Sequence, residues 1–154
     1  MKEAVAIAGR YSYLLRRHWF ARGVLNSYGQ VFFSNHPLFA VLLACITFID
    51  FYTGLFGLIA LLTAQGTATV LGMERYMVQQ GYYGFNALLT GMGMGLYYQP
   101  GLLLLLLVVL AGLLALLLAV VLQGVIGKYG LPHLSLPFIL SLWILMLASR
   151  EFGA

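Results

Sequence analysis

One stretch decides the fold class: residues 102–122 have the sequence LLLLLLVVLAGLLALLLAVVL. The stretch contains no polar side chain, and as an α-helix rising 1.5 Å per residue it would extend about 31 Å. The hydrocarbon core of a bilayer is about 30 Å thick, so this stretch predicts a membrane-spanning helix. Because it is apolar on every side, we expect it to face lipid and to carry no chemistry.

The composition of the whole chain agrees with a membrane protein. Of its 154 residues, 62% are hydrophobic and 8% are charged, whereas a soluble domain has about 25% charged residues. The mean hydropathy is +0.96. A net charge of only +4 leaves no basic groove that could follow a nucleic-acid backbone. We therefore predict an all-α integral protein of the cell or inner membrane that binds no nucleic acid.

Four further apolar segments predict helices that cross the membrane, which makes five crossings in all. They are residues 37–50, 55–71, 82–96 and 134–148. Pro37 suits the first turn of a helix, where its missing N–H costs nothing. We expect Thr53 and Gly54 to form a turn. Gly91 and Gly95 have the small-xxx-small spacing that lets two helices approach closely in lipid.

The segments between these helices are shorter or more polar. Residues 24–35 contain Asn26, Gln30 and Ser34 and are too short to span a bilayer, which needs about 20 apolar residues. We therefore count them as one half-crossing. Two of the five crossings are short and rich in Gly or Pro, and such interrupted segments are tolerated at membrane depth where they line a passage. The domain division is then a basic interfacial segment at 1–23, a membrane repeat at 24–149 and a short tail at 150–154.

The charge distribution predicts the orientation. With five crossings the two termini lie on opposite sides of the membrane. All of the eight Lys and Arg residues except Arg150 then lie on the N-terminal side, so by the positive-inside bias the N-terminus is cytoplasmic. Such a strong bias also makes efficient antiparallel pairing of the chain with itself unexpected.

Three stretches combine polar or helix-breaking residues with an apolar setting. They are residues 29–37 (GQVFFSNHP), 81–91 (GYYGFNALLTG) and 131–138 (LPHLSLPF). Together, and in this order, they resemble the urea transporter family: its re-entrant pore helix, its Gly-Phe-Asn segment and its Leu-Pro-x-x-Thr-x-Pro-Phe signature. The resemblance covers residues 29–149 and identifies the chain as similar to one of the two inverted repeats of that family.

The resemblance implies a fold and an activity. The fold is five transmembrane helices plus one re-entrant pore half-helix, and the activity is passive passage of urea in single file through a slot between two repeats. Family members are commonly trimers. The second repeat would come from a continuation of the native chain, from a partner subunit or from an inverted copy; the charge bias favours a continuation.

The resemblance also implies which residues meet the solute. Gln30 corresponds to the polar residue of the pore helix, Phe33 to a slot aromatic and Phe85 to an outer aromatic. Leu89 corresponds to a slot aliphatic residue, and Ser135 stands where the family has a threonine hydroxyl. Each residue could instead have a purely structural role. Gln30 could form a helix–helix hydrogen bond, Ser135 could bond to a helical carbonyl, and the other three residues could serve ordinary packing.

The chemistry of urea also agrees with this assignment, independently of the family resemblance. Urea is planar, neutral and polar, so apolar walls suit its faces while amide, hydroxyl and carbonyl groups replace water along its edge. We interpret Asn86 as structural, tying helix ends together, and place Asp50 and His133 at water interfaces.

Other functions are weighed against a urea channel. The alternatives are a channel for ammonia, water or a short amide, and a membrane anchor or sensor for a soluble domain. No metal-ligand spacing or nucleophile–base pair indicates an enzyme. We predict no cofactor and no metal.

Overall fold

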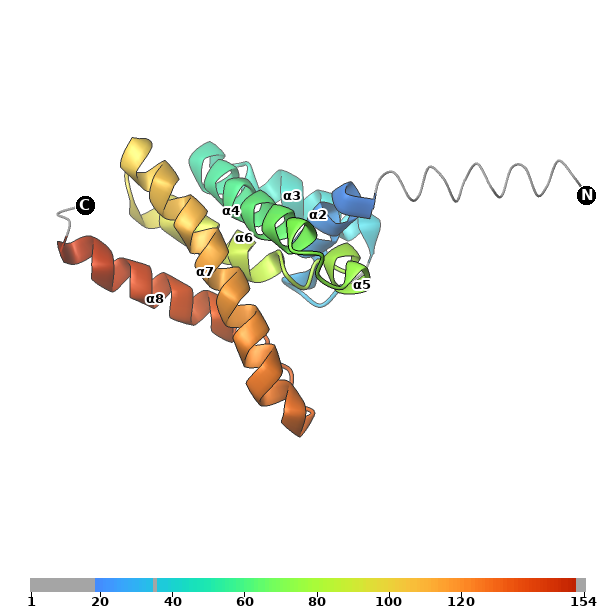
Figure 1. The fold of residues 1–154 in the computed structure, drawn as a ribbon. Coiled ribbons are helices and arrows are strands. Elements are labelled where there is room, and N and C mark those ends of the chain that lie inside the picture. The colour runs from blue at the N-terminus through green and yellow to red at the C-terminus, as the bar shows by residue number, and fades with distance from the viewer. Residues whose placement is uncertain (1–18, 35, 152–154) are drawn as a thin grey trace, which may run out of the picture.

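The computed structural model describes residues 19–34 and 36–151. Every regular element in these ranges is helical and none is a strand, which agrees with the predicted all-α class (Figure 1). The elements are α2 (Trp19–Gln30), α3 (Pro37–Thr47), α4 (Phe51–Val70), α5 (Arg75–Gln79), α6 (Phe85–Tyr97), α7 (Leu102–Ile126), η1 (Gly127–Tyr129) and α8 (Leu136–Glu151). Most of the predicted basic segment at 1–23 and of the tail at 150–154 lies outside the described residues.

Two stretches of the described chain are long and apolar enough to cross a membrane. They are Phe51–Val70, with 20 residues, and Leu102–Tyr129, with 28 residues. The second runs past the predicted end at residue 122, because α7 continues to Ile126 through Gly124. A single glycine costs a helix only about 1 kcal/mol, so it does not end one that long. The helices of Pro37–Thr47 and Leu136–Ser149 are apolar but shorter.

The predicted turn at Thr53 and Gly54 was wrong. The connection between α3 and α4 lies before them, and both residues belong to the first turn of α4. Thr53 Oγ1 donates to Asp50 Oδ2 at 2.6 Å, so the carboxylate is held at the start of the helix. Gly54 serves close packing, since a Cβ there would lie 2.7 Å from the Thr47 carbonyl oxygen.

The core lies where α4, α6 and α7 pack against one another. The predicted close approach at Gly91 is confirmed, because a Cβ at that position would lie 2.4 Å from the Phe56 carbonyl oxygen of α4. A Cβ at Gly112 of α7 would lie 2.6 Å from the Ala60 carbonyl oxygen, also of α4. In a membrane, such small residues let backbones touch and gain dispersion contacts.

The expectation that α7 faces only lipid was wrong. One stripe of it is buried against its neighbours: Leu104, Val108, Ala111, Gly112, Ala115, Leu116 and Ala119. Its uniform apolarity hid this stripe, because the sequence offers no polar face to mark the opposite side. Leu103, Leu106, Leu110 and Leu117 remain exposed.

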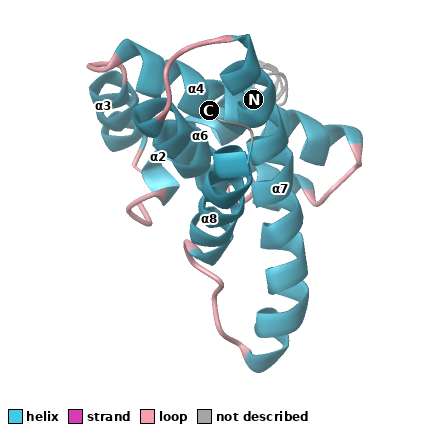
Figure 2. Ribbon diagram, turned by 90° about the vertical axis from the view of Figure 1, so that its left-hand side faces the viewer, coloured by secondary structure: helices cyan, strands magenta, loops and turns pink. Residues whose placement is uncertain are grey.

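Helix α8 starts beside the middle of α7, and the connection before it runs back from the far end of α7 (Figure 1 and Figure 2). Polar side chains link α8 to α6. The Thr90 and Ser141 hydroxyls, both fully buried, lie 2.9 Å apart, and Tyr98 pairs with Ser149 near the other end of the two helices. Buried hydroxyls without such partners would be costly in an apolar setting.

Candidate functional site

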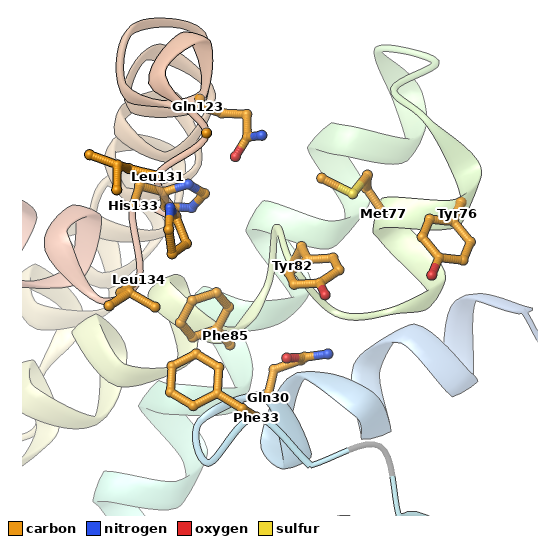
Figure 3. A pocket seen from close by; sticks show the side chains of 13 residues that line it. Gln30, Phe33, Tyr76, Met77, Tyr82, Phe85, Gln123, Leu131, His133 and Leu134 are labelled. Atoms are coloured by element: carbon orange, nitrogen blue, oxygen red, sulfur yellow. The ribbon is translucent and has the colours of Figure 1, made fainter.

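A cavity of about 620 Å³ lies where the end of α2, the α5–α6 region, the end of α7 and the connection before α8 meet (Figure 3). Its volume is in the range of about 300–1,000 Å³ that is usual for small-molecule sites. The residues around it are Gln30, Phe33, Tyr76, Met77, Tyr82, Phe85, Gln123, Gly127, Gly130, Leu131, Pro132, His133 and Leu134.

The lining of this cavity is polar in places but uncharged. No Asp, Glu, Lys or Arg of the described chain lines it. Its polar side chains are the amides of Gln30 and Gln123, the phenols of Tyr76 and Tyr82, and the His133 imidazole. His133 lies in the connection between η1 and α8, outside the membrane-spanning helices, and burial lowers its pKa below the usual value. The imidazole is therefore neutral at pH 7.

The structure brings together three of the five residues predicted to meet the solute. Gln30, Phe33 and Phe85 line the same cavity, with the two rings close to the Gln30 amide (Figure 3). Leu89 and Ser135 are half-buried and are not among its lining residues. Leu89 lies one turn further along α6 than Phe85, and Ser135 directly follows the lining residue Leu134.

Hydrogen bonds from α2 to the α5–α6 region set the position of Gln30. Asn26 Nδ2 donates to the Gln79 carbonyl at 2.8 Å, and the buried Ser27 hydroxyl lies 3.3 Å from the Gly81 carbonyl. Gly81 has φ +79°, and a Cβ there would lie 2.4 Å from the Ser27 nitrogen. This contact places the end of α2, and therefore Gln30, close to the start of α6 at Phe85.

The chain turns sharply after α2 and presents Phe33 to the cavity. The Ser34 N–H donates back to the Gly29 carbonyl at 3.0 Å, and the Phe33 N–H donates to the Gln30 carbonyl at 3.0 Å. A Cβ at Gly29 would lie 2.3 Å from the Ser34 carbonyl oxygen, so the turn closes only over glycine. Phe33 adopts φ +55° and is 65% exposed. A bulky residue in this region costs about 1–2 kcal/mol.

The connection before α8 contains the second such residue. Leu134 adopts φ +46°, and Asn86 holds the backbone around it. Asn86 Nδ2 donates to the Leu134 carbonyl at 3.2 Å, and Asn86 Oδ1 accepts from the Phe138 N–H at 3.2 Å. Asn86 is fully buried. The structural interpretation of Asn86 is thereby confirmed.

Phe33 and Leu134 share a further property. They are the only non-glycine residues with positive φ in the described part of the chain, and both line the cavity. Strained backbone persists only where its surroundings enforce it, and it gathers at functional sites. The cavity is therefore the best candidate for the functional site.

His133 departs from the expected water interface. Both of its ring nitrogens are covered by protein atoms and have no hydrogen-bond partner in the structure. A buried polar group left unpaired costs about 1–3 kcal/mol. Sequence reasoning did not place His133, Leu134, Tyr82 or Gln123 in the site. For His133 and Leu134 a signal existed, since they lie inside the stretch at residues 131–138 that carries the family resemblance.

A comparison with protein-family models gives one match. Residues 21–154 match the model of the urea transporter. The chain belongs to the urea transporter family. This urea transporter chain is consequently a membrane protein concerned with urea transport, and not an enzyme. The match includes every residue of the cavity described above.

Proposed function

We propose that this urea transporter chain forms one half of a passive channel in which urea moves in single file past Phe33 and Phe85. The observation that supports this proposal best is the uncharged lining of the 620 Å³ cavity. Charged groups would hold ions and water in a pore, whereas a neutral planar amide needs apolar surfaces for its faces and hydrogen-bonding groups for its edge.

Each predicted residue has a role in the proposed path. The Gln30 amide hydrogen-bonds urea at one mouth, and the Phe33 and Phe85 rings contact its flat faces. Leu89 provides an aliphatic wall one turn beyond Phe85, and the Ser135 hydroxyl bonds urea near the midpoint. The contribution of Leu89 and Ser135 is supported by their place next to lining residues, on α6 and in the connection before α8.

The half-pore role is supported by the exposure of two side chains that line the cavity. Phe33 is 65% exposed and Leu134 is 49% exposed, so one side of the proposed slot lacks a wall among the residues that the structure describes. A second repeat, from a continuation of the native chain, a partner subunit or an inverted copy, would supply that wall. We further propose a multi-pass arrangement of five crossings with a cytoplasmic N-terminus, and a trimer as the resemblance implies.

Urea flux into proteoliposomes tests the proposal. With the complete assembly reconstituted, including the second repeat, the wild-type protein should equilibrate urea faster than empty vesicles, and urea analogues should compete. Gln30→Leu should lower the flux about fivefold or more, since loss of one hydrogen bond worth about 1 kcal/mol changes a rate by that factor. Gln99→Leu is the matched control, because Gln99 is exposed and lies away from this cavity.

Two results would contradict the proposal. One is urea flux no faster than that of empty vesicles when the complete assembly, including the second repeat, is reconstituted. The other is an unchanged flux in Gln30→Leu when Gln99→Leu is also unchanged, because the cavity would then not lie on the path.

A further inference from the structure

His133 has a combination of properties that no other cavity residue shows. It lines the cavity, and both its ring nitrogens are covered and unpartnered. Figure 3 shows its ring on the side of the Phe85 and Phe33 rings away from Gln30. A neutral imidazole offers one N–H donor and one nitrogen acceptor, and in this structure neither is used.

We propose that the His133 imidazole is a hydrogen-bonding contact for the permeating solute and selects small neutral amides, which carry both N–H donors and a carbonyl acceptor. This inference rests on the proposed channel function. A solute held at His133 would use the donor and the acceptor of the ring at once, which a solute with hydroxyl groups alone matches less well.

The contact requires a rotation of the ring. Both nitrogens are covered as the ring now lies, so contact with a solute requires the ring to turn about the Cβ–Cγ bond until a nitrogen faces the cavity. This terminal torsion is broad in histidine and has no strongly preferred well. The unpaired nitrogens gain partners in the rotated position, so a solute in the cavity favours it.

The surroundings of His133 also make the proposed solute contact depend on whether the imidazole is charged. The titratable groups that share the cavity are the Tyr76 and Tyr82 phenols. Lys128 and Tyr129 of η1 are exposed and do not line it. Protonation would remove the acceptor nitrogen and place an uncompensated charge in a neutral passage. Because burial lowers the pKa of His133, this change occurs only in acid.

Transport measurements form the first test. His133→Leu should lower urea flux about fivefold and raise the half-saturating urea concentration, while glycerol leak is unchanged. The flux of the wild type should fall severalfold as the pH is lowered below the ordinary imidazole pKa of about 6.5 and the ring protonates. His133→Gln keeps a neutral donor and acceptor, so it should retain most of the flux at neutral pH and lose the acid sensitivity.

His36 provides the matched control, because it is exposed and is not a cavity residue. His36→Leu should keep both the flux and the acid sensitivity of the wild type. The proposal is overturned if folded His133→Leu transports like the wild type, or if the acid sensitivity survives in His133→Gln.

A titration that does not depend on transport forms the second test. In detergent-solubilised protein with ¹⁵N-labelled histidine, urea should shift the His133 ring signals saturably, while the His36 signals stay in place and glycerol has no effect. Ring signals of His133 that do not move with urea overturn the proposal. If the wild type carries no urea, the channel function fails while this titration still decides whether His133 contacts urea.

Discussion

The turn after α2 and the connection before α8 reach the same cavity by different means. Each places a bulky residue at positive φ, Phe33 at +55° and Leu134 at +46°. The turn after α2 closes on its own backbone, which requires the missing side chain of Gly29. The connection before α8 is held from outside by the Asn86 amide. The positive φ of Phe33 is thus enforced by a nearby glycine, and that of Leu134 by a hydrogen-bonding side chain from a distant part of the chain.

The Asn86 hydrogen bonds that hold the connection before α8 should be more sensitive to mutation than the turn at Gly29. Asn86→Leu leaves the Leu134 carbonyl and the Phe138 N–H without partners, and each costs about 1–3 kcal/mol when buried. We expect the free energy of unfolding to fall by about 2–4 kcal/mol and the urea flux to fall at least about tenfold. Thermal unfolding in detergent and proteoliposome flux measure the two effects.

Asn86→Asp separates the two hydrogen bonds. The carboxylate still accepts from the Phe138 N–H but cannot donate to the Leu134 carbonyl, so its loss of flux should be as large as that of Asn86→Leu. Wild-type stability and flux in Asn86→Leu would show that the connection holds its shape without this side chain.

The local support is tested at Gly29. Gly29→Ala places a Cβ 2.3 Å from the Ser34 carbonyl oxygen, so the turn must open. Overpacking of this kind costs about 1–3 kcal/mol, and displacement of Phe33 should reduce the flux. Gly66→Ala in α4 is the control, since nothing lies within 4 Å of that position, and it should stabilise the helix by up to about 1 kcal/mol. Equal unfolding temperatures for the two variants would rule out the close contact.

A third change separates strain from function at Phe33. Asparagine tolerates positive φ better than phenylalanine, so Phe33→Asn should leave the unfolding temperature unchanged or slightly raised, by about 0.5–1 kcal/mol of free energy. The flux should nevertheless fall severalfold, because the aromatic wall is lost.

Phe32 is the neighbouring control. It is similarly exposed, at 62%, but its ring packs against Phe39 with 5.9 Å between centroids. Phe32→Asn should therefore lose stability and keep its flux. The opposite pattern in the two variants would mean that Phe32, and not Phe33, forms the wall.

The smallest effect concerns the hydroxyl pair of α6 and α8. In a double-mutant cycle of Thr90→Val and Ser141→Ala, the coupling energy should be about 0.6 kcal/mol, the average for hydrogen bonds between membrane helices. The 2.9 Å separation of the two hydroxyls sets this expectation. A coupling of zero would show that α8 is held beside α6 by apolar packing, the Tyr98–Ser149 pair and the Asn86 contacts, without a contribution from the Thr90–Ser141 pair.

Several features of the site followed from local sequence. A short helix before Phe33 was predicted because Asn26, Gln30 and Ser34 interrupt an apolar region; α2 does end at Gln30 but begins at Trp19, inside the predicted interfacial segment, and its re-entrant character stays a prediction. Gln30, Phe33 and Phe85, which the resemblance to the urea transporter family indicated, share one cavity. The structural role of Asn86 also followed from its place at the start of a helix. By contrast, the turn at Thr53 and Gly54 was misplaced, because glycine marks close packing as often as it marks a turn in membrane helices.

The sequence by itself determined that the chain is a helical membrane protein and showed which stretches resemble a urea transporter. Apolar length and residue order are enough for both conclusions, because a bilayer requires long apolar helices with internally satisfied backbones. Only the tertiary structure decided that Tyr82, Gln123, His133 and Leu134 border the same cavity as Gln30. These residues come from separate elements, and their meeting depends on how closely α4, α6 and α7 pack, which no local pattern encodes.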